Sequence, residues 1–164
     1  MNSNSPEAVL HLEQFLPYRL SVLANTLSAS LAGLYAPQYG LTPPEWRVIA
    51  VLAQHPGLTA AGVVARTAMD KVAVSRAVAR LLRQGRLSRR RSTDDRRCTS
   101  LELTRVGQAL YRDVAPRALA YERDLLQILP KAEQARLNSI LELLTRRARE
   151  LHDGRIIEAT QDPG

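Results

Sequence analysis

The chain has 164 residues, of which 45% are hydrophobic, and its formal net charge is +7. This length and this apolar content exclude wholesale disorder and predict a single domain with a buried core. Apolar runs are interrupted too often for a membrane span, and the first residues lack the basic and apolar regions of a secretory signal. The single cysteine excludes an internal disulfide framework. We therefore expect a cytoplasmic protein with no membrane partner.

The positive charge is concentrated in one segment. Residues 66–97 contain eleven basic and three acidic residues, a net charge of +8, whereas the remaining 132 residues carry 12 basic and 13 acidic ones. Localised basicity is typical of proteins that bind a polyanion. A solvated, arginine-rich helix face is the alternative explanation for a charge run taken alone.

Apolar spacing is helical over most of the chain. Ser5 predicts the start of a short helix that Pro17 ends, and a longer helix with leucines on one side follows over residues 17–35. Pro37 and Gly40 predict a break after it.

A strong helix start follows at Thr42, because Glu45 three residues later can close a capping box. The helix that it opens should end at His55, and a shorter helix should run from Thr59 to Thr67.

The next helix, capped by Asp70 and ended by Gly85, has two different faces. Apolar residues recur at helical spacing on one side, and arginines lie on the opposite side. The apolar residues are Val74, Val78, Leu81 and Leu82, and the arginines are Arg76, Arg80 and Arg83. One face is suited to a core and the other to a polyanion.

After Gly85 the spacing of the apolar residues changes from the helical period to the alternation of strands. Residues 86–92 and 98–103 are strand candidates, and residues 93–97 form the turn between them. Thr104 is placed to cap a long helix to about Leu129, bent near Pro116, and residues 130–152 predict a last helix. The sequence thus predicts a mainly α-helical fold with a small β-hairpin.

Two short helices joined by a tight turn and followed by a basic hairpin are typical of a winged helix-turn-helix. The second helix enters the major groove with its N-terminal residues. There Arg76 is placed to read a guanine, and Val72 or Ala73 to contact a thymine methyl group. The other basic and polar residues suit phosphate contacts or an adjacent minor groove. The predicted DNA-binding residues are Lys71, Val72, Ala73, Ser75, Arg76, Arg80, Arg89, Arg90, Arg91, Asp95, Arg96 and Arg97.

Acidic residues at the hairpin tip have two explanations. Asp95 can orient Arg97 toward DNA, or the turn can favour aspartate for its backbone hydrogen bonds.

Residues 42–107 resemble the winged helix of the multiple-antibiotic-resistance regulator (MarR) family. The resemblance is carried by Leu41-Thr42, by Ser75-Arg76 with Leu81 and Gly85, by Asp95-Arg96-Arg97, and by Leu103-Thr104 with Gly107. It implies a single MarR-like domain over residues 1–164, with dimerisation helices in 5–36 and 108–153. It further implies an obligate homodimer that represses from a pseudo-palindromic operator in double-stranded DNA. Residues 69–76 resemble a branch that includes regulators of aromatic-acid catabolism.

Dimerisation also has a physical argument from the sequence. The helices predicted over residues 17–35, 104–129 and 131–152 have leucine-rich faces larger than one small winged helix can cover. Completion of a monomeric core is the alternative.

The resemblance implies a small-molecule effector, since ligands of this family often bind between the dimer helices and the winged helix. We expect an aromatic carboxylic acid or its coenzyme A thioester. Aromatic residues gather in the corresponding sequence region, although ordinary core packing explains aromatic residues at helical spacing equally well. The predicted ligand-binding residues are His11, Phe15, Tyr18, Arg19, Ser28, Tyr39, Trp46 and Arg47.

Other functional classes have less support. The common phosphate-loop, dinucleotide, zinc-protease and serine-hydrolase motifs are lacking, and no metal-site spacing of His, Cys and carboxylates is found. We therefore expect no enzyme activity, no cofactor and no metal. A sequence-nonspecific architectural DNA-binding protein and a protein-interaction adaptor remain the alternatives.

Overall fold

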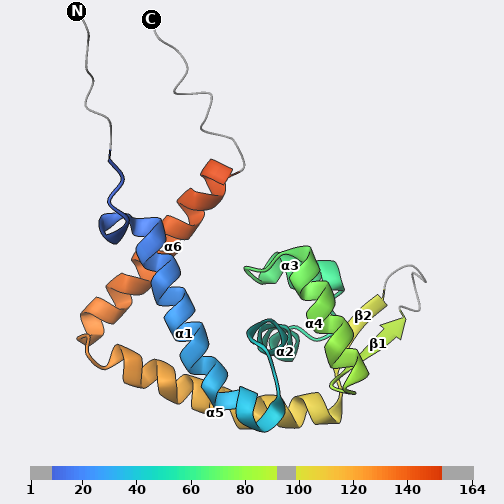
Figure 1. Cartoon of the computed structure of the whole chain (residues 1–164). Coiled ribbons are helices and arrows are strands. Elements are labelled where there is room, and N and C mark those ends of the chain that lie inside the picture. Colours follow the sequence, from blue (N-terminus) through green and yellow to red (C-terminus); the bar gives the residue numbers. More distant parts are fainter. Residues whose placement is uncertain (1–8, 92–98, 153–164) are drawn as a thin grey trace, which may run out of the picture. The chain divides into compact units, whose positions relative to one another are not determined.

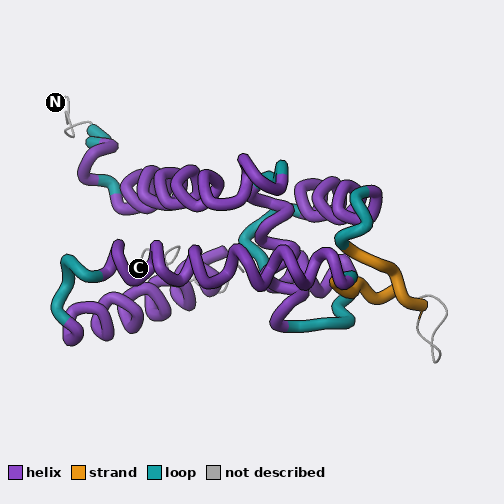
Figure 2. Tube along the Cα trace, turned by 90° about the horizontal axis from the view of Figure 1, so that it is seen from below, coloured by secondary structure: helices purple, strands orange, loops and turns teal. Residues whose placement is uncertain are grey.

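The computed structural model describes residues 9–91 and 99–152. The elements in chain order are the 3-10 turn η1 (Leu12–Gln14), helices α1 (Leu16–Tyr39), α2 (Pro43–Gln54), α3 (Ala60–Arg66) and α4 (Lys71–Arg83), strands β1 (Leu87–Arg91) and β2 (Thr99–Leu103), and helices α5 (Arg105–Leu126) and α6 (Lys131–His152). Figure 2 shows a mainly helical chain with one β-hairpin. The predicted fold class is confirmed.

The chain divides into two compact units, of which the first ends at Leu119 and the second begins at Ala120. No helix in the described ranges is both long enough and apolar enough to span a membrane.

The N-terminal prediction was wrong in two places. Residues 9–15 contain only the turn η1 rather than the end of a helix. The break expected at Pro37 is also absent, because Pro37 lies inside α1, which ends at Gly40 in the left-handed conformation with φ 60°. A proline so near the carboxyl end costs α1 one backbone hydrogen bond, and the contacts of Tyr39 described below hold the last turn.

One hydrophobic core connects the elements of the first unit. It is centred on α2 and α4, and α1, α3, the hairpin and α5 contribute further residues. Figure 1 labels these elements. The buried residues are Tyr35, Leu41, Val48, Ile49, Leu52, Val63, Val74, Ala77, Val78, Leu81, Leu87, Leu101, Leu110 and Val114. Burial of each large apolar side chain stabilises the fold by about 1.5–3 kcal/mol, so this cluster fixes α4 against α2 and α3.

Helix starts follow the predicted capping chemistry. The N–H of Thr42 donates to Oε2 of Glu45 over 2.7 Å, as in a capping box. Oγ1 of Thr59 accepts from the N–H of Gly62 over 3.1 Å. Each side chain satisfies a backbone N–H that the first helical turn leaves unpaired.

The β-hairpin has a fixed register, with Leu87 opposite Leu103 and Arg89 opposite Leu101. Leu58, in the loop before α3, forms an isolated β-bridge with Leu101, on the side of β2 that faces away from β1. The hairpin is therefore joined by backbone hydrogen bonds to the helix-turn-helix.

A tight junction joins α4, β1 and α5. Helix α4 ends in a Schellman motif, in which Arg86 N–H donates to Leu81 O over 2.9 Å and Gly85 adopts φ 66°. The hydroxyl of Thr104 donates to Gly85 O over 2.7 Å. A Cβ on Gly107 would lie 2.3 Å from Arg86 O, so α5 can approach this turn only with glycine there.

The second unit contains the end of α5 and helix α6. Nε2 of Gln134 donates to the carbonyls of Leu126 and Leu129, each over 2.9 Å, and so fixes the connecting turn. Helix α6 has no buried residue in the described chain.

We predict that Gly107→Ala destabilises the first unit by about 1–3 kcal/mol, because the added methyl group must displace backbone rather than a flexible side chain. Urea unfolding followed by circular dichroism measures this. Gly33→Ala is the matched control, since Gly33 is also helical and a Cβ there meets nothing within 4 Å. It should stabilise the helix by about 0.5–1 kcal/mol. Equal stability of the two variants would contradict the packing of α5 on Arg86.

Candidate nucleic-acid interface

Helices α3 and α4 form the helix-turn-helix. Oδ1 of Asp70 accepts from the N–H of Ala73 over 2.8 Å and caps α4 as predicted. The apolar face of α4 packs on α2 and α3, with Val74, Ala77, Val78 and Leu81 all buried. Its opposite face is therefore held outward along its full length.

The first turns of α4 expose most of the predicted contact residues. Lys71, Ser75 and Arg76 are exposed, and Ala73 is half-buried. Val72, an apolar residue of the same turn, is 57% exposed. A cation, a hydroxyl and an apolar group thus share the surface that a recognition helix turns toward base edges.

Arg80 has a different position from the one expected. Its Nε lies 3.0 Å from Oε1 of Glu45, and its Nη2 donates to Gly40 O over 3.3 Å. The Glu45 side chain is 1% exposed, and no aligned hydrogen bond reaches Oε1, so Arg80 supplies the compensating charge. The sequence predicted Glu45 as a cap only and Arg80 as a phosphate contact, and their pairing was missed.

The hairpin arginines do not share one face. The register places Arg89 beside Leu101 on one face and Arg90 beside Ser100 on the other. Arg90 Nη1 lies 3.5 Å from Oε1 of Glu102 in an exposed pair, which contributes little stability. Arg91 pairs with Thr99 in the backbone register. The predicted contacts at Asp95, Arg96 and Arg97 lie outside the described residues.

The eight predicted ligand-binding residues do not converge within one chain. His11, Phe15, Tyr18 and Arg19 are exposed around the start of α1. Tyr39 is in its last turn, about 30 Å from Tyr18 at a rise of 1.5 Å per residue. Within one chain these residues therefore do not line a single site, and their assignment as ligand contacts stays a prediction.

Three of those residues do come together. Nη2 of Arg47 donates to Oγ of Ser28 over 3.1 Å, and the neighbouring Trp46 stacks between Tyr35 and Tyr111 with ring centroids 5.6 and 6.0 Å away. Burial raises the pKa of the Tyr35 hydroxyl, and the nearby Arg47 guanidinium partly offsets this. An arginine, two hydroxyls and an aromatic stack therefore lie at the contact of α1 with α2.

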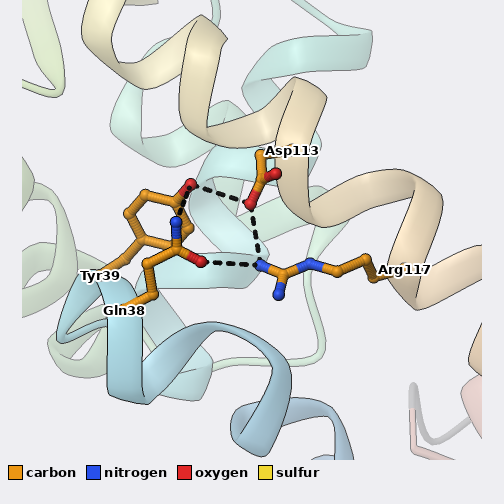
Figure 3. Close-up of polar contacts among 4 residues, drawn as sticks. All are labelled: Gln38, Tyr39, Asp113 and Arg117. Atoms are coloured by element: carbon orange, nitrogen blue, oxygen red, sulfur yellow. Dashed lines mark hydrogen bonds and ion pairs between the residues drawn. The ribbon is translucent and has the colours of Figure 1, made fainter.

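The Tyr39 side chain contacts α5 (Figure 3). Its hydroxyl donates to Oδ2 of Asp113 over 2.9 Å, and Nη2 of Arg117 donates to the same oxygen over 2.9 Å. The hydrogen bond to Asp113 raises the pKa of Tyr39. Nε2 of Gln38 donates to Tyr39 Oη over 3.1 Å, which completes the network. The network fastens the last turn of α1 to α5.

A separate cavity of about 360 Å³ lies between α2, β2 and α5. Leu52, Leu103 and Tyr111 are apolar parts of its lining, and Glu102 and Arg112 are charged parts. None of the predicted ligand-binding residues lines it. In the described part of the chain, no cluster of His, Cys and carboxylate residues is placed to hold a metal ion.

The model of the MarR family matches residues 39–97, the segment from the end of α1 to the hairpin. A MarR/EmrR family transcriptional regulator from Acinetobacter sp. ADP1 superimposes with a TM-score of 0.80 at 26% identity, covering 86% of this chain and 99% of that one. This segment of the chain therefore matches the MarR family, and the solved structure shares its fold. Members of this family are DNA-binding transcriptional regulators rather than enzymes.

Two further solved structures share the MarR fold. PcaV from Streptomyces coelicolor, in complex with its natural ligand, has a TM-score of 0.74 at 24% identity, covering 87% of this chain and 99% of PcaV. BpsR from Bordetella bronchiseptica, whose DNA binding is regulated by 6-hydroxynicotinic acid, has a TM-score of 0.74 at 22% identity, covering 84% and 98%. The curated proteins include no match.

We predict that two substitutions of the α4 cap separate its effect on stability from its effect on DNA affinity. Asp70→Ala removes the acceptor for Ala73 N–H and should cost about 1 kcal/mol of stability. Asp70→Asn keeps a capping oxygen and removes a negative charge beside the basic face, so duplex affinity should rise at low salt. Thermal unfolding and fluorescence anisotropy with a labelled duplex measure the two effects. Asp70→Asn with unchanged or weaker duplex binding would show that this end of α4 does not approach DNA.

Proposed function

We propose that the chain is a sequence-specific DNA-binding regulator that represses transcription as a homodimer. The proposal is supported by the exposed first half of α4, where the side chains of Arg76 and Val72 are exposed on a helix whose other face is buried. Arginine bidentate to guanine and an apolar group against a thymine methyl are the contacts that distinguish base pairs in the major groove. The lobe that presents them spans residues 42–107.

Exposed apolar residues in the described part of the chain support the homodimer. In the first unit, Leu12, Phe15, Leu16, Leu20 and Leu23 are exposed at the beginning of α1 and before it. In the second unit, the exposed apolar residues of α6 are Ile140, Leu141, Leu143, Leu144 and Leu151. Such density of exposed leucine is unusual for a monomer and typical of a surface that a second subunit covers. We assign dimerisation to residues 5–36 and 108–153, within one functional domain.

A small aromatic carboxylic acid is the effector that we propose. The guanidinium of Arg47 suits a carboxylate, the hydroxyls of Ser28 and Tyr35 suit ring substituents, and Trp46 supplies an aromatic surface. BpsR, a fold relative, responds to an acid of this kind. A coenzyme A thioester of the same acid is the second candidate. By binding the DNA-incompetent arrangement more tightly, the effector would release the repressor from its operator. This regulator would act in the cytoplasm.

We predict that Arg76→Ala lowers the preference for operator over random duplex by about 5–150-fold, because it removes a contact that reads bases. Arg90→Ala should weaken binding to every duplex and reduce the salt dependence, since its expected partner is a phosphate. Anisotropy titrations with the DNA upstream of the coding sequence, and with a shuffled duplex, measure both.

Equal losses on operator and shuffled DNA for Arg76→Ala would contradict base reading. A wild-type chain that binds all duplexes equally would instead identify an architectural DNA-binding protein.

We predict that Arg47→Gln retains operator binding and loses release by aromatic acids, because the carboxylate loses its cationic partner. Operator release by a panel of hydroxybenzoates, hydroxynicotinates and their thioesters measures this. Arg112→Gln is the matched control, since Arg112 lines the separate cavity. Release lost in Arg112→Gln and kept in Arg47→Gln would move the effector to that cavity.

A further inference from the structure

The carboxyl end of α1 is held from two sides. On one side, the Tyr39 hydroxyl is bound to Asp113 of α5 (Figure 3). From the recognition-helix side, Arg86 Nη2 donates to Tyr39 O over 2.6 Å and Arg80 Nη2 donates to Gly40 O over 3.3 Å. We call the five residues Tyr39, Gly40, Glu45, Arg80 and Arg86 the arginine joint.

Each guanidinium group of the arginine joint satisfies the hydrogen-bonding capacity or the charge of its acceptor. The last carbonyls of a helix have no intrahelical partner and carry partial negative charge, so two guanidinium groups satisfy them. Glu45 contributes a buried carboxylate at the start of α2, where Thr42 N–H binds one oxygen and Arg80 faces the other. Arg80 thus contacts the end of α1 and the start of α2 at once.

Arg80 lies on α4, four residues after Arg76 and one turn along the same helix. If Arg80 moved to a phosphate, Glu45 would keep a buried charge whose second oxygen has no hydrogen-bond donor. That cost opposes the use of Arg80 as a DNA contact, although its basic character and its position in the sequence suggest one.

We propose that Arg80 is a positioning residue, which together with Glu45 fixes the angle at which α4 presents Arg76 to DNA, and that it makes no phosphate contact of its own. This inference rests on the proposed function, because it assigns the origin of sequence preference in the same surface. Arg76 lies one helical turn from Arg80 on α4. A change in the ion pair of Arg80 therefore shifts Arg76 and alters the preference for the operator.

The salt dependence of binding separates a positioning residue from a phosphate contact. Each lost phosphate contact reduces the slope of log affinity against log salt by about 0.9, whereas a displaced helix with all its phosphate contacts retained leaves the slope unchanged. Arg83→Gln is the matched control, since Arg83 is exposed on the same helix three residues later.

The experiment compares wild type, Arg80→Gln, Arg83→Gln and the double variant Glu45→Gln/Arg80→Gln, each checked for folding by circular dichroism. Anisotropy titrations from about 50 to 200 mM salt use a duplex that the wild-type chain selects from a random pool, and a shuffled duplex. We expect Arg80→Gln to lose about tenfold in operator preference with an unchanged slope, and Arg83→Gln to keep its preference with a slope reduced by about one.

The double variant should recover most of the preference that Arg80→Gln loses, because Glu45→Gln retains a side-chain oxygen that can cap Thr42 and removes the buried charge. If Arg80→Gln fails to fold, the same measurements on the double variant test the inference. A slope reduced by about one in both Arg80 variants, with no recovery in the double variant, would overturn the inference. A wild-type chain without operator preference would refute the proposed function, and the slopes on shuffled DNA would still decide the role of Arg80.

Discussion

The ion pair between Glu45 and Arg80 is the constraint on which the DNA-binding lobe depends. A carboxylate that is 1% exposed needs a compensating charge, and the structure supplies it from the solvent-facing side of α4. The recognition helix is therefore held in place by electrostatics on one side and by its buried valines and leucine on the other.

The same pair connects the lobe to the rest of the first unit. Gly40 accepts from Arg80 where the left-handed turn ends α1, and Tyr39 contacts both Arg86 and Asp113. A shift of α1 would thus reach α4 through polar contacts whose geometry is directional. The cluster of Arg47 and Ser28 lies on the same two helices, α1 and α2. An effector bound there would act next to the elements that hold the recognition helix.

Local chemistry explains which parts of the fold were predictable from the sequence. The caps at Thr42 and Asp70 and the stop at Gly85 depend on residues within five positions of each other, and each was predicted and is present. The pairing of Glu45 with Arg80 joins residues 35 positions apart, and each residue already had a sufficient local explanation. The break expected at Pro37 was wrong for a related reason, because the contacts of Tyr39 with the distant α5 hold the last turn of α1.

The central claim is that two recognition helices, each held by this ion pair, read DNA from a paired assembly. Hydroxyl-radical footprinting of the wild-type chain on the DNA upstream of its coding sequence tests it most directly. The account predicts two protected patches related by a dyad, with centres about 10 base pairs or one helical turn apart. Continuous protection without a dyad, or a single patch from one subunit, would contradict it.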